Sequence, residues 1–62
     1  MNYKIVARDN RTRRQVKKRI YTTLESYEKY SPELIKRYLH LGYEVEVYVQ
    51  VSGKWCISFI ED

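Results

Sequence analysis

Side chains that commonly perform catalysis are scarce in this chain of 62 residues, which has one histidine, His40, and one cysteine, Cys56. A cysteine nucleophile needs a base within reach, and a zinc site needs more ligands than this pair supplies. Glu44 and Glu46 stand two apart, as paired carboxylates can, but a solvated strand face also explains them. Two glycines cannot build a phosphate-binding loop. We therefore expect no catalytic residues, no metal site and no cofactor, and predict a protein that is not an enzyme.

Basic residues near the N-terminus give the strongest functional signal. Residues 1–19 hold eight Lys or Arg against one Asp, whereas residues 43–62 hold one Lys against four acidic residues. Such a basic end favours nucleic acid or an acidic protein surface as partner. Five of the seven clustered residues are Arg, which suits bidentate contacts with phosphates and carboxylates. The cluster comprises Arg8, Arg11, Arg13, Arg14, Lys17, Lys18 and Arg19.

The length predicts one domain, residues 1–62, near the lower limit at which a single core suffices. Seven Tyr, one Trp and one Phe supply large apolar areas for so short a chain. No stretch approaches the ~20 apolar residues of a membrane span, and the N-terminus lacks the apolar run of a signal peptide. We expect a cytoplasmic protein without a membrane partner.

Residues 2–8 and 13–22 are expected to be strands joined by a turn at 9–12, because Asp and Asn favour turns. Alternation places Tyr3, Ile5 and Ala7 inward in the first strand. In the second, an inward charge would protect the sheet edge from pairing with other chains. Its inward residues are expected to be Val16, Lys18, Ile20 and Thr22, and its outward residues Gln15, Lys17, Arg19 and Tyr21.

A helix is expected to begin near Thr22, whose spacing to Glu25 fits a capping box, with Thr23 as the competing cap. Apolar residues recur at helical spacing from there to Leu41. Proline removes a helical hydrogen bond, so we expect a kink or a break at Ser31-Pro32. Gly42 is expected to end the helix in a left-handed conformation.

Tyr43–Val51 alternates strictly between apolar and polar residues, and residues 55–60 follow after Ser52-Gly53-Lys54, which predicts a hairpin. The element order ββαββ predicts an α+β fold: one four-stranded antiparallel sheet of order 2-1-3-4 with one helix on one face. In this arrangement Glu44 and Glu46 would face Lys4 and Arg8 across neighbouring strands.

The loop of this hairpin decides which residues reach the uncovered side of the sheet. A two-residue turn at Ser52-Gly53 would place Trp55, Ile57 and Phe59 there, whereas a three-residue loop with left-handed Gly53 would bury all three. The three-residue loop is favoured because so small a core needs its largest side chains. The uncovered side would then carry Lys4, Val6, Arg8, Lys17, Arg19, Tyr21, Tyr48, Gln50, Cys56, Ser58 and Ile60. On it, Tyr21 and Tyr48 are candidate stacking platforms for nucleic-acid bases.

A short basic chain rich in Tyr, Lys, Glu and Ile is similar to the small accessory proteins of bacteriophages. Thr23-Leu24-Glu25 and Gly42-Tyr43-Glu44-Val45 resemble the small RNA polymerase inhibitor of T7-like phages, whose chain also runs hairpin, helix, strand. That family places contacting arginines in the strand after the helix, where this chain has Val47 and Val49. The resemblance therefore implies only a small module that blocks or redirects a larger host machine in the host cytoplasm.

Three functions follow as hypotheses. The preferred one is a phage-encoded binding protein that inhibits or redirects a host protein by contacting its acidic surface. The first alternative is a nucleic-acid-binding module. The second is a homodimer joined through the last strand, whose exposed edge carries no inward charge. The binding residues expected for the first two are Arg8, Arg11, Arg13, Arg14, Lys17, Arg19, Tyr21 and Tyr48.

Overall fold

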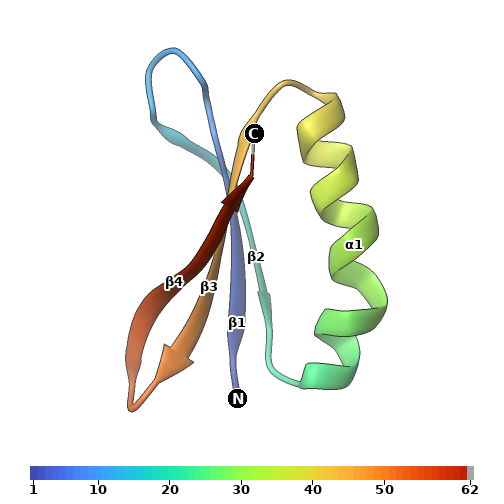
Figure 1. Cartoon of the computed structure of the whole chain (residues 1–62), viewed down its shortest axis with the longest axis vertical. Helices are drawn as coiled ribbons and strands as arrows, with labels where there is room; N and C mark the ends of the chain where they lie inside the picture. Colours follow the sequence, from blue (N-terminus) through green and yellow to red (C-terminus); the bar gives the residue numbers. More distant parts are fainter. Residues whose placement is uncertain (62) are drawn as a thin grey trace.

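A computed structural model describes residues 1–61, which form four strands and one helix. The elements are β1 (Tyr3–Arg8), β2 (Gln15–Tyr21), α1 (Leu24–His40), β3 (Glu44–Val51) and β4 (Lys54–Glu61). All neighbouring strands are antiparallel, and their order is β2-β1-β3-β4. The helix covers one face of the sheet (Figure 1). The predicted α+β fold and strand order are confirmed.

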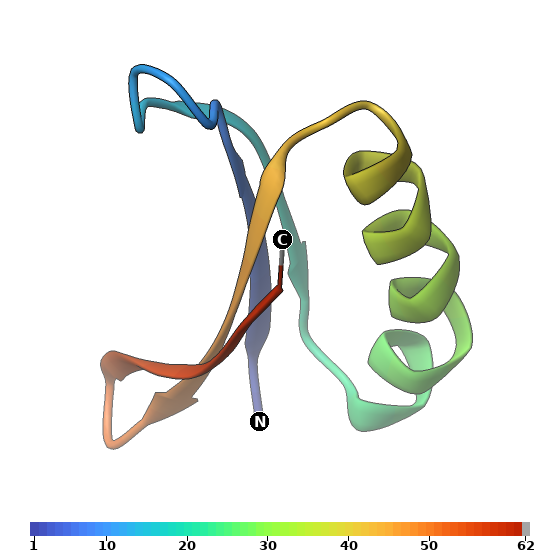
Figure 2. The same ribbon diagram turned by 45° about the horizontal axis from the view of Figure 1, so that its top comes forward.

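The sheet is bent away from its helix. The ends of both hairpins curl toward the side opposite α1, as Figures 1 and 2 show from two directions. We call this side the open face and the other the helix side. Since the hairpin ends curl over it, the open face is concave, and side chains at its centre are shielded from solvent.

The core lies between α1 and the three strands that it packs against, β1, β2 and β3. Inward alternation of β1 and β3 supplies its aliphatic part, as predicted. Aromatic rings close its ends, with Tyr3 stacked on Tyr27 at 4.3 Å between ring centroids. The buried members are Ile5, Ala7, Tyr21, Tyr38, Val45 and Val47.

Local signals at the ends of α1 behave largely as predicted. Thr23, the competing cap, begins the helix, and its hydroxyl accepts a hydrogen bond from the Ser26 N–H at 3.2 Å. The helix continues through Pro32 without a break. Gly42 follows with a φ of 87°, and the N–H of Tyr43 reaches back to the Tyr38 carbonyl. This Schellman arrangement turns the chain directly into β3.

From Lys17 to Tyr21 the faces of β2 are reversed relative to the prediction, whereas Gln15 lies on the open face as predicted. A β-bulge leaves Val16 without a partner, so Ala7 lies opposite Lys17, whereas Arg8 lies opposite Gln15. One extra residue moves every following side chain to the other face. Tyr21 therefore reaches the core, where only 6% of it is exposed and its ring meets Tyr27 edge-on. The prediction is wrong for Lys17, Arg19 and Tyr21, which lie on the helix side, and for Lys18 and Ile20, which lie on the open face.

The second hairpin follows neither predicted register throughout. Ser52 and Gly53 form a two-residue turn with φ values of 51° and 79°, so the favoured three-residue loop is wrong. Trp55 and Ile57 consequently lie on the open face, opposite Gln50 and Tyr48. A bulge at Ser58 then returns Phe59 to the helix side, opposite Val47. Cys56, which was expected on the open face, lies on the helix side opposite Val49, whereas Ile60 lies on the open face as predicted.

Candidate binding surface

The open face is the candidate site, and its residues follow from the pairing of the strands. Directly opposed residues of an antiparallel sheet share a face, and β1 contributes its even-numbered residues to the open face. The face combines cations, carboxylates and aromatic rings at its centre with aliphatic side chains on its outer strands. Its members are Lys4, Val6, Arg8, Gln15, Lys18, Ile20, Glu44, Glu46, Tyr48, Gln50, Trp55, Ile57 and Ile60.

Glu46 organises the centre of this face. Its Oε1 accepts hydrogen bonds from Arg8 Nε at 2.7 Å and from the Tyr48 hydroxyl at 2.8 Å. The Glu46 side chain is 9% exposed, so it needs such partners to stay ionised. Burial would raise the pKa of Glu46, but the Arg8 and Tyr48 hydrogen bonds outweigh it and hold that pKa below its usual value. The ordered carboxylate fixes both partner side chains.

The loop between β1 and β2 is held in place by its own polar side chains. The Asp9 carboxylate accepts hydrogen bonds from the N–H groups of Thr12 and Arg11 at 3.0 and 2.8 Å, and these bonds lower the pKa of Asp9. Asn10 Nδ2 donates to the Gly42 carbonyl at 2.9 Å and ties the loop to the end of the helix. Arg13, with a φ of 65°, donates to Glu44 Oε2 at 2.6 Å. The loop is therefore ordered before any partner binds.

Lys4 occupies the aromatic part of the open face. Its Nζ lies 4.8 Å from the centroid of the Tyr48 ring and 4.6 Å from that of Trp55. A cation at this distance over two rings gains from both quadrupoles. The predicted pairing of Lys4 with a glutamate is not formed, because Glu46 and Glu44 pair with Arg8 and Arg13 instead.

The predicted binding residues divide into three groups. Arg8, Arg13 and Tyr48 converge on the two glutamates and are structural parts of the site. Arg11 and Arg14 are exposed on the loop. The remaining three lie on the helix side of β2, where Lys17 and Arg19 are exposed, whereas Tyr21 is buried.

Sequence reasoning misplaced several members of the site. Trp55 and Ile57 were expected in the core, and Lys18 and Ile20 on the helix side. Lys4 was expected on this face, but paired with a carboxylate. The available signal was the Ser52-Gly53 dipeptide, since a two-residue turn needs positive φ at both positions and glycine supplies the second readily. Given that turn, the alternation of the strands places Trp55 beside the ring of Tyr48 and the stem of Lys4.

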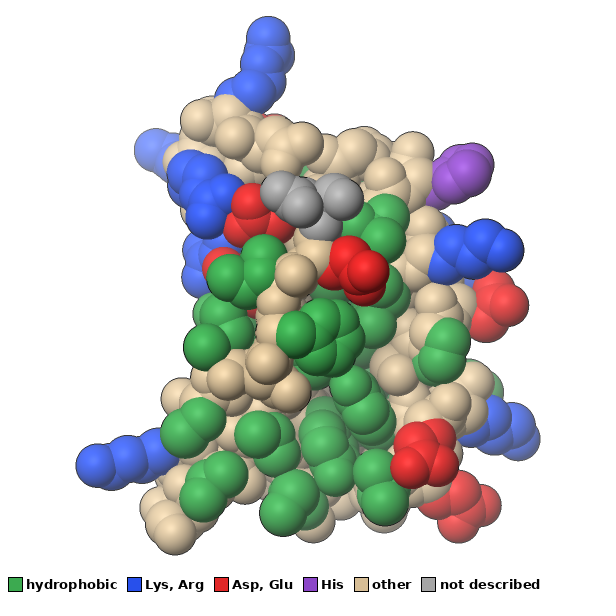
Figure 3. All heavy atoms as spheres, viewed as in Figure 1, with side chains coloured by type: hydrophobic (Ala, Val, Ile, Leu, Met, Phe, Trp, Pro, Cys, Tyr) green, Lys and Arg blue, Asp and Glu red, His purple; other side chains and the backbone are tan. Residues whose placement is uncertain are grey.

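Aliphatic side chains border the charged centre. Ile20 on β2 and Ile57 and Ile60 on β4 are each about half exposed, at 46%, 51% and 54%. Single exposed aliphatic residues are common, but these belong to one concave face. In Figure 3, Lys and Arg side chains gather around the tip of the first hairpin, whereas hydrophobic ones gather between β4 and α1.

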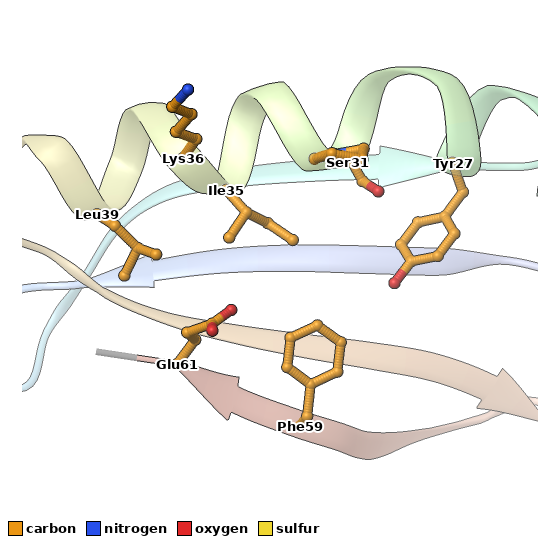
Figure 4. A pocket seen from close by; sticks show the side chains of 8 residues that line it. Tyr27, Ser31, Ile35, Lys36, Leu39, Phe59 and Glu61 are labelled. Carbon is orange, nitrogen blue, oxygen red and sulfur yellow. The ribbon is translucent and has the colours of Figure 1, made fainter.

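A groove of about 450 Å³ separates α1 from β4 on the helix side. Figure 4 shows Phe59 and Glu61 of β4 directed toward the helix, with Tyr27, Ile35 and Leu39 facing them. Phe59 is still 41% exposed there, because α1 packs over the other three strands. The groove is apolar, and it leaves the inner surface of β4 only partly covered.

Within residues 1–61, no three His, Cys, Asp or Glu side chains lie together as a metal would require, and no helix is long and apolar enough to cross a membrane. Comparison with known protein families, curated proteins and solved structures finds no match. The resemblance to phage proteins, the cytoplasmic location and the partner all stay predictions.

Proposed function

We propose that this chain is a non-enzymatic binding protein that uses the open face and the ordered basic loop to hold an acidic surface of another protein. The observation that carries the proposal is that two of the arginines pair with glutamates of the open face, whereas two others are exposed on the loop. Arg8 and Arg13 neutralise Glu46 and Glu44, so the centre of the face loses its negative charge. The exposed Arg11 and Arg14 are then free to contact carboxylates of the partner.

Two features favour a protein over nucleic acid. Protein–DNA interfaces are strongly polar and positively charged, whereas the edges of this face are aliphatic, at Ile20, Ile57 and Ile60. The Tyr48 and Trp55 rings are covered by the Lys4 ammonium, which competes with a base for the same ring faces. A protein surface matches this face if its carboxylates meet the basic loop and its apolar side chains meet the aliphatic border.

The order of the loop between β1 and β2 also supports a role in protein binding. Binding costs less free energy when the contacting loop is already ordered, and Asp9, Asn10 and Arg13 fix this one through hydrogen bonds. A small module of this kind can occupy a functional surface of a larger protein and block or redirect it. Inhibition of a host protein by a phage-encoded chain is the form of this proposal that the sequence resemblance suggests.

The test is retention of proteins from a nuclease-treated bacterial lysate on three immobilised forms of the chain. The first form is wild type, and the second carries Arg11→Glu and Arg14→Glu. The third carries Lys29→Glu and Arg37→Glu, which make the same change in charge on the exposed side of α1. We expect one stoichiometric protein to bind wild type and the helix variant, and to be lost from the loop variant.

Trp55 gives a second measurement because it is the single tryptophan and lies on the open face. Titration with a retained protein that contains no tryptophan should change the fluorescence of Trp55. If untreated lysate yields only nucleic acid, released steeply as salt rises, the nucleic-acid alternative replaces the proposal. Equal binding by all three forms would also overturn it.

A further inference from the structure

β4 is an unusual edge strand. The other edge, β2, presents Lys17, Lys18 and Arg19 in succession, which discourages pairing with another chain. Within residues 1–61 no strand pairs with the outer edge of β4, and its interior, from Trp55 to Ile60, carries no charge. The strand is also exposed along nearly its whole length. Such an edge is a template for another strand.

The direction of the backbone groups of β4 follows from β3. The Gln50 N–H donates to Asn2 on the β1 side at 2.9 Å, so the odd-numbered residues of β3 direct their backbone groups to β4. Their partners are Lys54, Cys56, Phe59 and Glu61, which therefore use their own N–H and C=O groups toward β3. Trp55, Ile57 and Ile60 pair with even-numbered residues of β3, so they direct theirs to the outer edge of β4.

An antiparallel second copy fits this pattern when β4 pairs along its full length. Trp55 then lies opposite Ile60 of the second copy, and both have outward backbone groups. Both also lie on the open face, opposite Gln50 and Glu46 of their own chain. Cys56 lies opposite Phe59 of the second copy, and both are on the helix side. These pairs share a face because of the bulge at Ser58. In a regular strand of the same register, each residue would lie opposite one whose side chain points to the other face.

Charge agrees with the same register. Full-length pairing places Lys54 opposite Glu61 of the second copy, and the two-fold axis repeats the pair at the other end. Both residues are exposed and lie on the helix side. Opposite charges that face each other across strands stabilise a pair, whereas like charges would oppose it. Backbone phase and face therefore match at three pairs, Lys54–Glu61, Trp55–Ile60 and Cys56–Phe59, and charge matches at the first of them. The central pair is Ile57 opposite the bulged Ser58 of the second copy.

We infer that the chain forms a symmetric homodimer in which β4 of each copy pairs antiparallel with β4 of the other, in the register Lys54 to Glu61. The two sheets become one sheet of eight strands with both helices on the same side. β4, whose inner surface α1 leaves partly uncovered, then has a paired strand along each edge. The two open faces become continuous and present two basic loops to one partner.

Charge exchange tests the dimer without touching its core. The mass of the chain, 7.6 kDa, should double in sedimentation equilibrium at micromolar concentration. Lys54→Glu or Glu61→Lys alone should weaken dimerisation about tenfold, because like charges then meet at both ends. The double variant Lys54→Glu/Glu61→Lys should restore it. A monomer at all concentrations, or single variants that dimerise as wild type does, would overturn the inference.

Cysteine cross-linking tests the register. Cys56 and position 59 of the second copy form a non-hydrogen-bonded pair, in which Cα atoms lie about 4.5 Å apart and a disulfide can close. On mild oxidation Phe59→Cys should become a covalent dimer. Wild type, with Cys56 alone, and Cys56→Ser/Phe59→Cys, with position 59 alone, should not. Efficient cross-linking of either single-cysteine form would show a different register and refute this one, and circular dichroism establishes that each variant is folded.

Discussion

The hydrogen bonds to Glu46 predict a measurable coupling with Arg8. Glu46→Gln keeps the shape of the side chain but removes its charge, and so weakens two hydrogen bonds of 2.7 and 2.8 Å. Hydrogen bonds to charged groups contribute about 1.5–3 kcal/mol each, but Arg8 is 29% exposed and water can replace part of the loss. We expect a loss of about 2 kcal/mol in the free energy of unfolding. For a domain of this size that lowers the melting temperature by about 10 °C.

A double-mutant cycle separates the interaction between Arg8 and Glu46 from the other effects of each substitution. Arg8→Met and Glu46→Gln, alone and together, should give a coupling energy of about 1 kcal/mol by urea denaturation followed by circular dichroism. The matched control is Arg13→Met with Glu44→Gln. That pair has a similarly buried carboxylate, but its arginine is 56% exposed. We expect its coupling to be clearly smaller than that of the Arg8 pair, as for exposed ion pairs.

The reverse order of the two coupling energies would refute the reasoning. It would mean that exposure of the arginine does not set the strength of these pairs. Coupling near zero in both cycles would show that neither glutamate depends on its arginine, and that the centre of the open face is not neutralised in the way the proposed function requires. Equal denaturant slopes for all variants are needed before the energies are compared.

Two further predictions concern pH and the bulge in β2. The folded pKa of Glu46 lies below its ordinary value of 4.5, so its stabilising effect is full above that value and is lost as pH falls through the lower folded pKa. The stability difference between wild type and Glu46→Gln should therefore shrink between pH 6 and about pH 3, and a constant difference would contradict it. Tyr21→Ala should cost about 3 kcal/mol and Ile20→Ala under about 1 kcal/mol in thermal denaturation, because Tyr21 is buried and Ile20 is half exposed. The opposite order would place Ile20 in the core.

Much of the fold could be predicted because it depends on local patterns. Alternation in Tyr43–Val51 and helical spacing through Tyr38 specify which element each segment forms. The left-handed Gly42 ends the helix through backbone geometry that few other residues adopt. With five elements in this order, the rules for connections leave few sheet topologies, and 2-1-3-4 is the observed one.

The candidate site was only partly predictable because it depends on two bulges. A strand has a period of two, so the single extra residue at Val16 or at Ser58 exchanges the faces of everything beyond it. Nothing local in the sequence marks either position. The bulge in β2 brings Tyr21 to the helix side, where its ring meets the distant Tyr27 of α1.

The amino-acid sequence by itself therefore determined the elements, their order and the basic character of the first hairpin. The pairing of Arg8 with a glutamate was also predicted and is confirmed. Only the tertiary structure decided that Tyr21 is buried, that Trp55 and Lys4 meet Tyr48, and that Arg13 instead of Lys4 pairs with the second glutamate. The physical reason is that periodicity fixes the spacing of side chains along a strand, whereas the face they occupy is set by the pairing of strands far apart in the chain.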